Sequence, residues 1–188
     1  MKFKEIELKY RSDAVDLRTF KDFCLARLPV SETNASGYDH FYAKKGDKST
    51  FARHRVGADI NQLTFKRKTS DNNFIRTEHN LDLNAVKEDQ MAAFLGEFGY
   101  QFNVSIFKTC FIFHFDRYIF VYYVVYDTRM KELGRFIEAE MAEEYPWKSE
   151  DEAWNALLAL EKDFKTIGLN KVNRVKKSLF EMFKKGSK

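Results

Sequence analysis

Charged and apolar side chains alternate along the first ten residues, and this is the period of a β-strand. One face of the segment holds Phe3, Glu5, Glu7 and Lys9, and the other holds Lys4, Ile6, Leu8 and Tyr10. The pattern therefore predicts a strand over residues 2–10, with one face that is almost entirely ionic.

Seven later segments also have the composition of strands, because β-branched and aromatic residues are frequent in them and turn residues separate them. These segments are 37–44, 50–57, 62–69, 74–81, 103–115, 117–126 and 135–142. The expected turns include Gly46-Asp47, Gly57-Ala58-Asp59, Asp71-Asn72-Asn73 and Asp116-Arg117, since glycine, aspartate and asparagine favour tight connections. Eight strands, joined mainly by hairpins, are expected.

Four other segments carry apolar residues at helical spacing. They are 13–28, 84–99, 149–167 and 171–184. Ser12 or Asp13 is the expected cap of the first helix, Pro29 its end, and Asn84 the cap of the second. The sequence thus predicts an α+β fold, in which helices flank a mostly antiparallel sheet.

The composition is that of a folded protein with a sizeable core. The chain has 188 residues, of which 44% are apolar and 32% are charged, and no linker or internal repeat divides it. We therefore expect a single domain over residues 1–188. The net charge is only +4 and the basic residues are spread along the chain, which argues against nucleic-acid binding by a basic arm.

Cysteine usage and hydropathy indicate the cellular compartment in which the protein is expected. Cys24 and Cys110 are far apart and show no metal-binding spacing, so neither a zinc site nor a disulfide framework is indicated. The start of the chain has no apolar leader, and the most hydrophobic run, residues 118–126, is too short for a membrane helix. A cytoplasmic protein without membrane contact is expected.

Charged residues two positions apart recur on the predicted strands, where they share one face. The pairs are Arg53 with Arg55, Lys66 with Lys68, Arg76 with Glu78, and Glu138 with Glu140. One such pair is normally a solvated face of a half-buried strand. Their recurrence, in a sheet with enough strands to close into a barrel, instead predicts an ionic interior.

An interior rich in lysine and arginine calls for a polyanion, because unpaired buried charge is costly. Guanidinium and ammonium groups suit phosphate oxygens, while convergent carboxylates suit a hard divalent cation such as Mg²⁺ or Mn²⁺. The pattern predicts a site for a metal-bound phosphate compound.

Six short motifs follow one another along the chain: EIELK at 5–9, GYDHFY at 37–42, FARHR at 51–55, LTFKRK at 63–68, RTEHNL at 76–81 and ELGRFIEAEM at 132–141. In this order they resemble the motifs of the CYTH superfamily, also called the triphosphate tunnel metalloenzymes. The superfamily includes class IV adenylate cyclases and thiamine triphosphatases. The resemblance implies a closed or nearly closed eight-stranded antiparallel barrel that surrounds a triphosphate.

The resemblance also implies roles for individual residues. Mg²⁺ or Mn²⁺ would be held by Glu5, Glu7, Glu138 and Glu140, with Asp127 as a further candidate. The substrate would be bound by Lys9, Arg53, Arg55, Lys66, Lys68, Arg76, Glu78 and Lys108. Catalysis would be mainly electrostatic and would use Lys9, Arg53, Arg55, Lys66, Arg76 and Lys108. One position departs from the family pattern, since Cys110 stands where the superfamily usually has arginine in Lys-x-Arg.

The expected activity is that of a metal-dependent triphosphatase, acting on ATP, inorganic triphosphate or thiamine triphosphate, with RNA 5′-triphosphate as a further substrate. One alternative is an adenylate cyclase of class IV type, which would also need a base-recognition pocket that no motif supplies. A second alternative is a sensor that binds a nucleotide or polyphosphate without turnover. A monomer or homodimer is expected.

Overall fold

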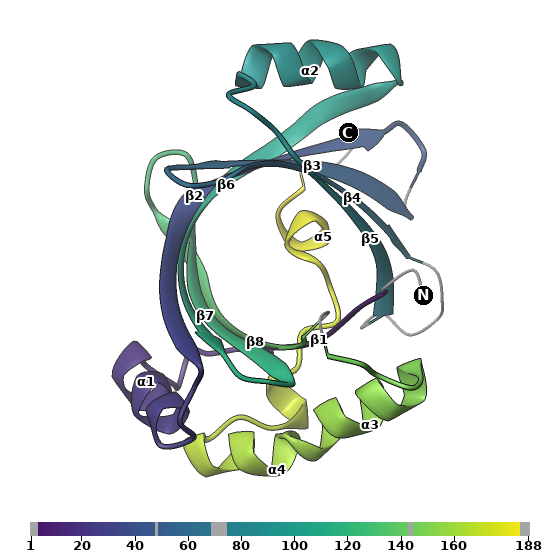
Figure 1. Cartoon of the computed structure of the whole chain (residues 1–188). Coiled ribbons are helices and arrows are strands. Elements are labelled where there is room, and N and C mark those ends of the chain that lie inside the picture. The colour runs from purple at the N-terminus through teal and green to yellow at the C-terminus, as the bar shows by residue number, and fades with distance from the viewer. Residues whose placement is uncertain (1–3, 48, 69–74, 143–144, 185–188) are drawn as a thin grey trace.

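The computed structural model describes residues 4–47, 49–68, 75–142 and 145–184, in which eight antiparallel strands form a closed barrel (Figure 1). The strands are β1 (Lys4–Arg11), β2 (Ser31–Lys44), β3 (Thr50–Gly57), β4 (Asn61–Lys68), β5 (Ile75–Asp82), β6 (Tyr100–His114), β7 (Tyr118–Tyr126) and β8 (Glu132–Met141). Their order around the barrel is β1-β5-β4-β3-β2-β6-β7-β8. The predicted α+β fold with a closed barrel is confirmed.

The first strand closes the barrel because it pairs with β5 on one side and with β8 on the other. Glu5 lies opposite Arg76, and Lys9 lies opposite Glu138. Strand β1 thereby joins β5 to β8 and closes the sheet. No strand of the barrel is left with an edge that is unpaired along its whole length.

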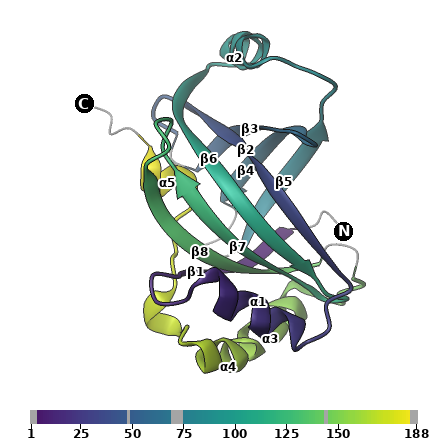
Figure 2. The same cartoon turned by 90° about the vertical axis from the view of Figure 1, so that its left-hand side faces the viewer.

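Helices cover the outside of the barrel at two opposite places (Figures 1 and 2). The helical elements are α1 (Leu17–Leu25), α2 (Glu88–Glu97), α3 (Glu150–Ala159), α4 (Glu161–Phe164), η1 (Lys165–Ile167), η2 (Lys171–Asn173) and α5 (Leu179–Phe183). Leu8 and Tyr10 of β1 point outward and pack with Phe20 of α1 and Leu157 of α3. The outer wall of the barrel is therefore the apolar one, and the inner wall carries the charges.

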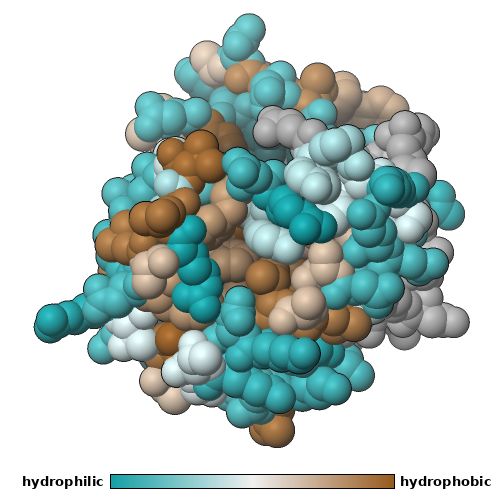
Figure 3. Space-filling view, turned by 60° about the horizontal axis from the view of Figure 1, so that its bottom comes forward, coloured by the Kyte–Doolittle hydropathy of each residue, from teal (hydrophilic) through white to brown (hydrophobic). Residues whose placement is uncertain are grey.

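The surface over α1, α3 and α4 is mixed, with apolar patches between larger hydrophilic areas (Figure 3). Among the described residues, no helix is both long enough and apolar enough to cross a membrane.

The predicted strands lie close to the observed ones, with β2 as the largest difference. This strand begins at Ser31 and not at residue 37, because its first six residues pair with the far end of β6, where Ser31 lies opposite His114. That first part is exposed and lacks the apolar alternation that marks a strand in sequence. Phe3 and the turn expected at Asp71-Asn72-Asn73 lie outside the described residues.

The first two helices are shorter than predicted, and their expected caps are wrong. The cap of α1 is Asp16, whose carboxylate Oδ1 accepts the Thr19 backbone N–H at 2.8 Å, whereas Ser12 and Asp13 precede the helix. Helix α2 follows Lys87 and not Asn84, since Ala85 has a left-handed backbone with φ of 52°.

The helix predicted at 171–184 is also wrong, because the chain is extended in its middle. The Val175 backbone N–H donates to the Lys9 carbonyl of β1 at 2.8 Å, and a helix resumes only at Leu179. Helix α5 then lies across the interior of the barrel as seen along its axis (Figure 1), and Phe180 packs against Phe41 and Phe51. The helix predicted at 149–167 is divided at residue 160 into α3, α4 and η1.

Candidate functional site

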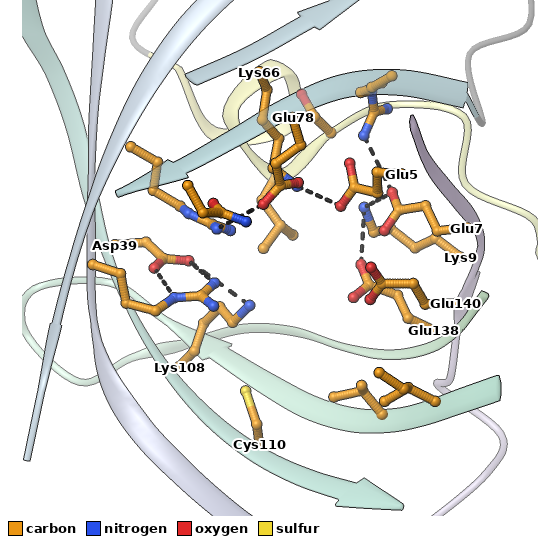
Figure 4. Close-up of a pocket in the computed structure, with 18 of the residues that line it drawn as sticks. Glu5, Glu7, Lys9, Asp39, Lys66, Glu78, Lys108, Cys110, Glu138 and Glu140 are labelled. Atoms are coloured by element: carbon orange, nitrogen blue, oxygen red, sulfur yellow. Dashed lines mark hydrogen bonds and ion pairs between the residues drawn. The ribbon is translucent and has the colours of Figure 1, made fainter. Parts of the chain in front are cut away.

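The inward side chains of the barrel line a cavity of about 320 Å³ (Figure 4). Its basic residues are Lys9, Arg53, Arg55, Lys66, Arg76 and Lys108, and its acidic residues are Glu5, Glu7, Asp39, Glu78, Glu138 and Glu140. The described lining thus contains six groups of each sign. Because strand side chains alternate, every second residue of β1, β3, β5 and β8 contributes to this lining.

Lys66 of β4 joins acidic residues from two other strands. Its Nζ donates to Glu5 Oε1 of β1 and lies 2.6 Å from Glu78 Oε2 of β5. Arg53 Nη2 lies 3.7 Å from the other oxygen of Glu78 and donates to the Thr64 hydroxyl at 3.0 Å. The ammonium of Lys66 is therefore held between a carboxylate of β1 and a carboxylate of β5.

Lys9 of β1 forms a second group with carboxylates of β1 and β8. Its Nζ lies 3.2 Å from Glu7 Oε1 and 3.0 Å from Glu138 Oε1. Arg76 Nη1 donates to the same Glu7 oxygen at 3.2 Å, and the Tyr123 hydroxyl donates to Glu138 at 2.7 Å. These bonds bring together the carboxylates of the EIELK and FIEAEM strands.

The buried carboxylates differ strongly in their protonation behaviour. Burial raises the pKa of Glu5 to about 7, although Lys66 opposes this, and burial with the nearby charges of Glu5 and Glu7 raises the pKa of Glu140 well above its usual value. Burial also acts on Glu7, but the ammonium of Lys9 and the guanidinium of Arg76 outweigh it and lower its pKa to about 2. Three carboxylates of one cavity wall therefore differ in the pH at which they become charged.

A separate group lies between β2, β3 and β6. Arg55 donates to both oxygens of Asp39, at 2.7 Å from Nε and 3.0 Å from Nη2, and Lys108 Nζ lies 3.7 Å from Asp39 Oδ2. Burial raises the pKa of Asp39, but Arg55 and Lys108 outweigh it and hold the pKa well below its usual value. Asp39 thus orients the two cations that face the cavity.

Sequence reasoning missed Asp39 and several neutral polar groups. Asp39 lies in the GYDHFY motif, and in the pairing of β2 with β3 it is directly opposite Arg55. The available signal was its spacing of two residues from Phe41, which places both side chains on the inward face of β2. Thr64, which Arg53 contacts, and Tyr123, which contacts Glu138, carried no comparable signal, because isolated threonine and tyrosine are common in strands.

Two predicted site residues lie away from the main cavity. Lys68 is exposed at the end of β4 and lines a small neighbouring pocket with Arg76 and Glu181. Asp127 lies in the turn after β7, where its Oδ1 accepts the backbone N–H groups of Arg129 at 2.8 Å and Lys131 at 2.9 Å. The structure does not bring Asp127 to the four glutamates, and its hydrogen bonds are those of a turn residue.

The sequence matches no protein-family model and no curated protein. The structure, in contrast, is similar to several solved structures. For PH1012 from Pyrococcus horikoshii OT3 the TM-score is 0.75 at 16% identity, covering 94% of this chain and 98% of the other. For a proposed adenylate cyclase from Vibrio parahaemolyticus it is 0.71 at 17% identity, covering 97% and 98%. The chain shares its eight-stranded barrel fold with these proteins.

A more distant similarity is to HpAC1 from Hippeastrum, an adenylyl cyclase candidate with a dominant triphosphatase activity. Its TM-score is 0.53 at 12% identity, covering 89% of this chain and 93% of the other. The resemblance drawn from the six motifs is thus confirmed for the fold. At these identities, the barrel fold is what the neighbours share with this chain.

The cavity inside the barrel, called the tunnel from here on, has carboxylate oxygens that suit a hard divalent cation. Glu5 Oε2 is buried without a hydrogen-bond partner among the described residues, and Glu140 lies close enough to Glu5 and Glu7 to feel their charge. Carboxylate oxygens are the ligands that Mg²⁺ and Mn²⁺ prefer. In the described part of the chain, however, no three carboxylate, imidazole or thiol groups are already arranged as a metal site. Lys9, Lys66 and Arg76 contact several of the carboxylate oxygens instead.

Proposed function

We propose that this protein is a divalent-metal-dependent triphosphatase that binds its substrate in the tunnel. The observation that carries the proposal is the lining itself, in which six cationic and six carboxylate groups converge on one cavity. Such a cavity has no surplus positive charge of its own, so a polyanionic triphosphate would enter it favourably only with compensating cations. Burial and the neighbouring carboxylates raise the pKa of Glu5 and Glu140, and a bound divalent cation would favour their charged forms.

Basic side chains from β3, β4, β5 and β6, together with Lys9 of β1, would hold the phosphate oxygens. Arg53, Arg55, Lys66 and Arg76 reach the cavity from β3, β4 and β5, and Lys108 reaches it from β6. Because these groups are fixed by Asp39, Glu78 and their other partners, they are already oriented toward the charge that develops during phosphoryl transfer. Their contribution is to bind, align and stabilise, without a covalent intermediate.

Glu5, Glu7, Glu138 and Glu140 are the residues that would hold Mg²⁺ or Mn²⁺, and Asp127 is left out of this set. When bound, the ion would screen the phosphate charge and make a coordinated water a better nucleophile. Lys9 would then exchange its contacts with Glu7 and Glu138 for phosphate oxygens. HpAC1, with its dominant triphosphatase activity, supports a hydrolase on this fold.

The test is to incubate the protein with ATP, inorganic triphosphate and thiamine triphosphate, each with Mg²⁺ or Mn²⁺, and to separate the products. Release of orthophosphate that stops with a chelator is expected. Formation of cyclic AMP with pyrophosphate would show a cyclase instead, and binding of triphosphate without any product would show a sensor.

A matched pair of variants connects the activity with the tunnel. Glu7→Gln removes a carboxylate that faces the cavity, whereas Glu132→Gln alters an exposed carboxylate paired with Arg135. We expect Glu7→Gln to lower kcat by at least about a hundredfold, with Glu132→Gln close to wild type. Equal activity of the two variants would refute the assignment of Glu7.

A further inference from the structure

Tyr123 of β7 lies behind the wall of the tunnel and contacts two of the side chains that line it. Its hydroxyl donates to Glu138 Oε1 at 2.7 Å, and the Lys108 ammonium lies over its ring, 4.5 Å from the ring centroid. Tyr123 itself is fully buried and does not belong to the described lining of the cavity. One side chain therefore joins a carboxylate of the tunnel to a cation of the tunnel.

Strand register explains why a single tyrosine reaches both groups. Tyr123 lies opposite Cys110 of β6 on one side and opposite Phe136 of β8 on the other. Lys108 and Glu138 are each two residues away from these partners, so they point to the same inner face as Tyr123 and lie diagonally to it. Lys108 and Glu138 are well apart in the cavity (Figure 4), and the long tyrosine side chain connects them.

The packing of the Tyr123 ring fixes the position of its hydroxyl. The ring stacks on Phe136, with centroids 5.4 Å apart and planes inclined by 23°. Both rings belong to the buried cluster that also includes Phe41 and Ile106. A donor that is held in this way restricts where the Glu138 carboxylate can lie.

Both carboxylates that hold Lys9 have a second partner. Glu7 Oε1 lies 3.2 Å from Lys9 Nζ and accepts a hydrogen bond from Arg76 at 3.2 Å. Glu138 Oε1 lies 3.0 Å from Lys9 Nζ, and Tyr123 donates to the same oxygen. Once Lys9 turns to a phosphate oxygen, Glu7 keeps Arg76 and its positive charge. Glu138 keeps the Tyr123 hydroxyl, which holds the carboxylate without a charge that would compete with a metal ion.

We propose that Tyr123 is a positioning residue for both halves of the tunnel, because its hydroxyl orients Glu138 for a divalent cation and its ring orients Lys108 for a phosphate group. The inference rests on the proposed function and adds to it a residue that does not touch the substrate. A neutral donor orients a carboxylate and leaves its charge to the metal ion. The face of an aromatic ring attracts an ammonium and leaves its N–H groups available to phosphate oxygens.

The experiment compares wild type with Tyr123→Phe and Tyr123→Leu. Calorimetry measures the Kd of Mn²⁺ without triphosphate and the Kd of inorganic triphosphate without metal. Tyr123→Phe removes the hydroxyl and keeps the ring, so the Kd of Mn²⁺ should rise by at least about tenfold while that of triphosphate changes by less than about threefold. Tyr123→Leu removes both groups and should raise both constants, that of triphosphate by more than about threefold. Tyr126→Phe, at a ring of the same strand that packs on Phe107, is the matched control and should bind both ligands as wild type does.

Lys108→Met keeps the test valid if Tyr123→Leu does not fold, because it removes the cation from an intact ring. It should weaken the binding of inorganic triphosphate by at least about tenfold and leave the Kd of Mn²⁺ within about threefold of wild type. The inference would be overturned by wild-type affinity for Mn²⁺ in Tyr123→Phe, by equal losses for the two ligands in that variant, or by a wild type that binds no Mn²⁺. The triphosphatase proposal fails on a different result, namely a wild type that binds both ligands and releases no orthophosphate.

Discussion

Asp39 shows how single buried charges are balanced in this protein. It is 1% exposed, both of its carboxylate oxygens accept hydrogen bonds from Arg55, and the Lys108 ammonium lies nearby. A buried carboxylate in such a position stabilises the folded state because removing it leaves uncompensated cations in a poorly hydrated interior. The same residue therefore serves both stability and the orientation of phosphate-binding groups.

Asp39→Asn is expected to lower the free energy of unfolding by about 3 kcal/mol at pH 7, because Arg55 and Lys108 lose their partner. The folded-state pKa of Asp39 is depressed, so its stabilisation is complete above the unfolded pKa of about 3.9 and is lost as the pH falls below that value. The difference between wild type and variant should therefore shrink from pH 7 to pH 3 in urea titrations.

The control for this prediction is Asp13→Asn, at an exposed carboxylate that pairs only with exposed Arg11 among the contacts described. It should change stability by less than about 0.5 kcal/mol. A stability difference for Asp39→Asn that does not depend on pH would contradict the assignment of the effect to the Asp39 charge.

At the scale of the element, α5 contributes apolar surface to the interior of an otherwise ionic barrel. Leu179 and Phe180 are buried in a cluster with Phe41, Phe51 and Phe136. Phe41, Phe51 and Leu179 of this cluster also line the cavity, at the end where α5 packs. The polar character of the interior is thus confined to the middle and to the end away from α5.

Phe180→Ala is expected to destabilise the protein by about 3 kcal/mol, because it removes a buried ring and leaves a cavity between α5 and the barrel. Phe94→Ala, at a ring that is 51% exposed on α2, should cost less than about 1 kcal/mol. Chemical denaturation measures both. Similar small effects for the two variants would mean that α5 does not pack inside the barrel in solution.

At the scale of the whole molecule, barrel closure makes a binding site from residues that are distant in sequence. Glu7 and Glu140 come from the first and the last strand, and the pairing of β1 with β8 places them opposite each other. Charges of both signs face inward from seven strands, and a ligand that binds the folded barrel alone would stabilise it against unfolding.

Inorganic triphosphate with Mg²⁺ or Mn²⁺, at about a hundred times its Kd, is expected to stabilise the fold by about 2.7 kcal/mol, which corresponds to a Tm increase of roughly 5–10 °C. Thermal unfolding with and without a chelator measures the shift. Sulfate at the same ionic strength serves as the control for salt. An undiminished shift in the presence of the chelator would refute a role for the metal in binding.

Strand existence and the ionic inner face could be predicted from the sequence because alternation is a local property of neighbouring residues. The paired charges at Arg53 and Arg55, and at Glu138 and Glu140, lie in the cavity for this reason. Helix starts were predicted less well, since Asp16 and Lys87 compete with Ser12 and Asn84 as caps, and left-handed Ala85 was not recognisable from the sequence.

The amino-acid order by itself determined which side chains share a face and, through the motif series, the family of folds to which the barrel is similar. Only the tertiary structure decided which of these residues meet. It brought Asp39 to Arg55, left Asp127 in a turn and directed α5 into one end of the barrel. The physical reason is that alternation depends on the local geometry of one strand, whereas these contacts depend on strand register and closure, which the whole chain sets.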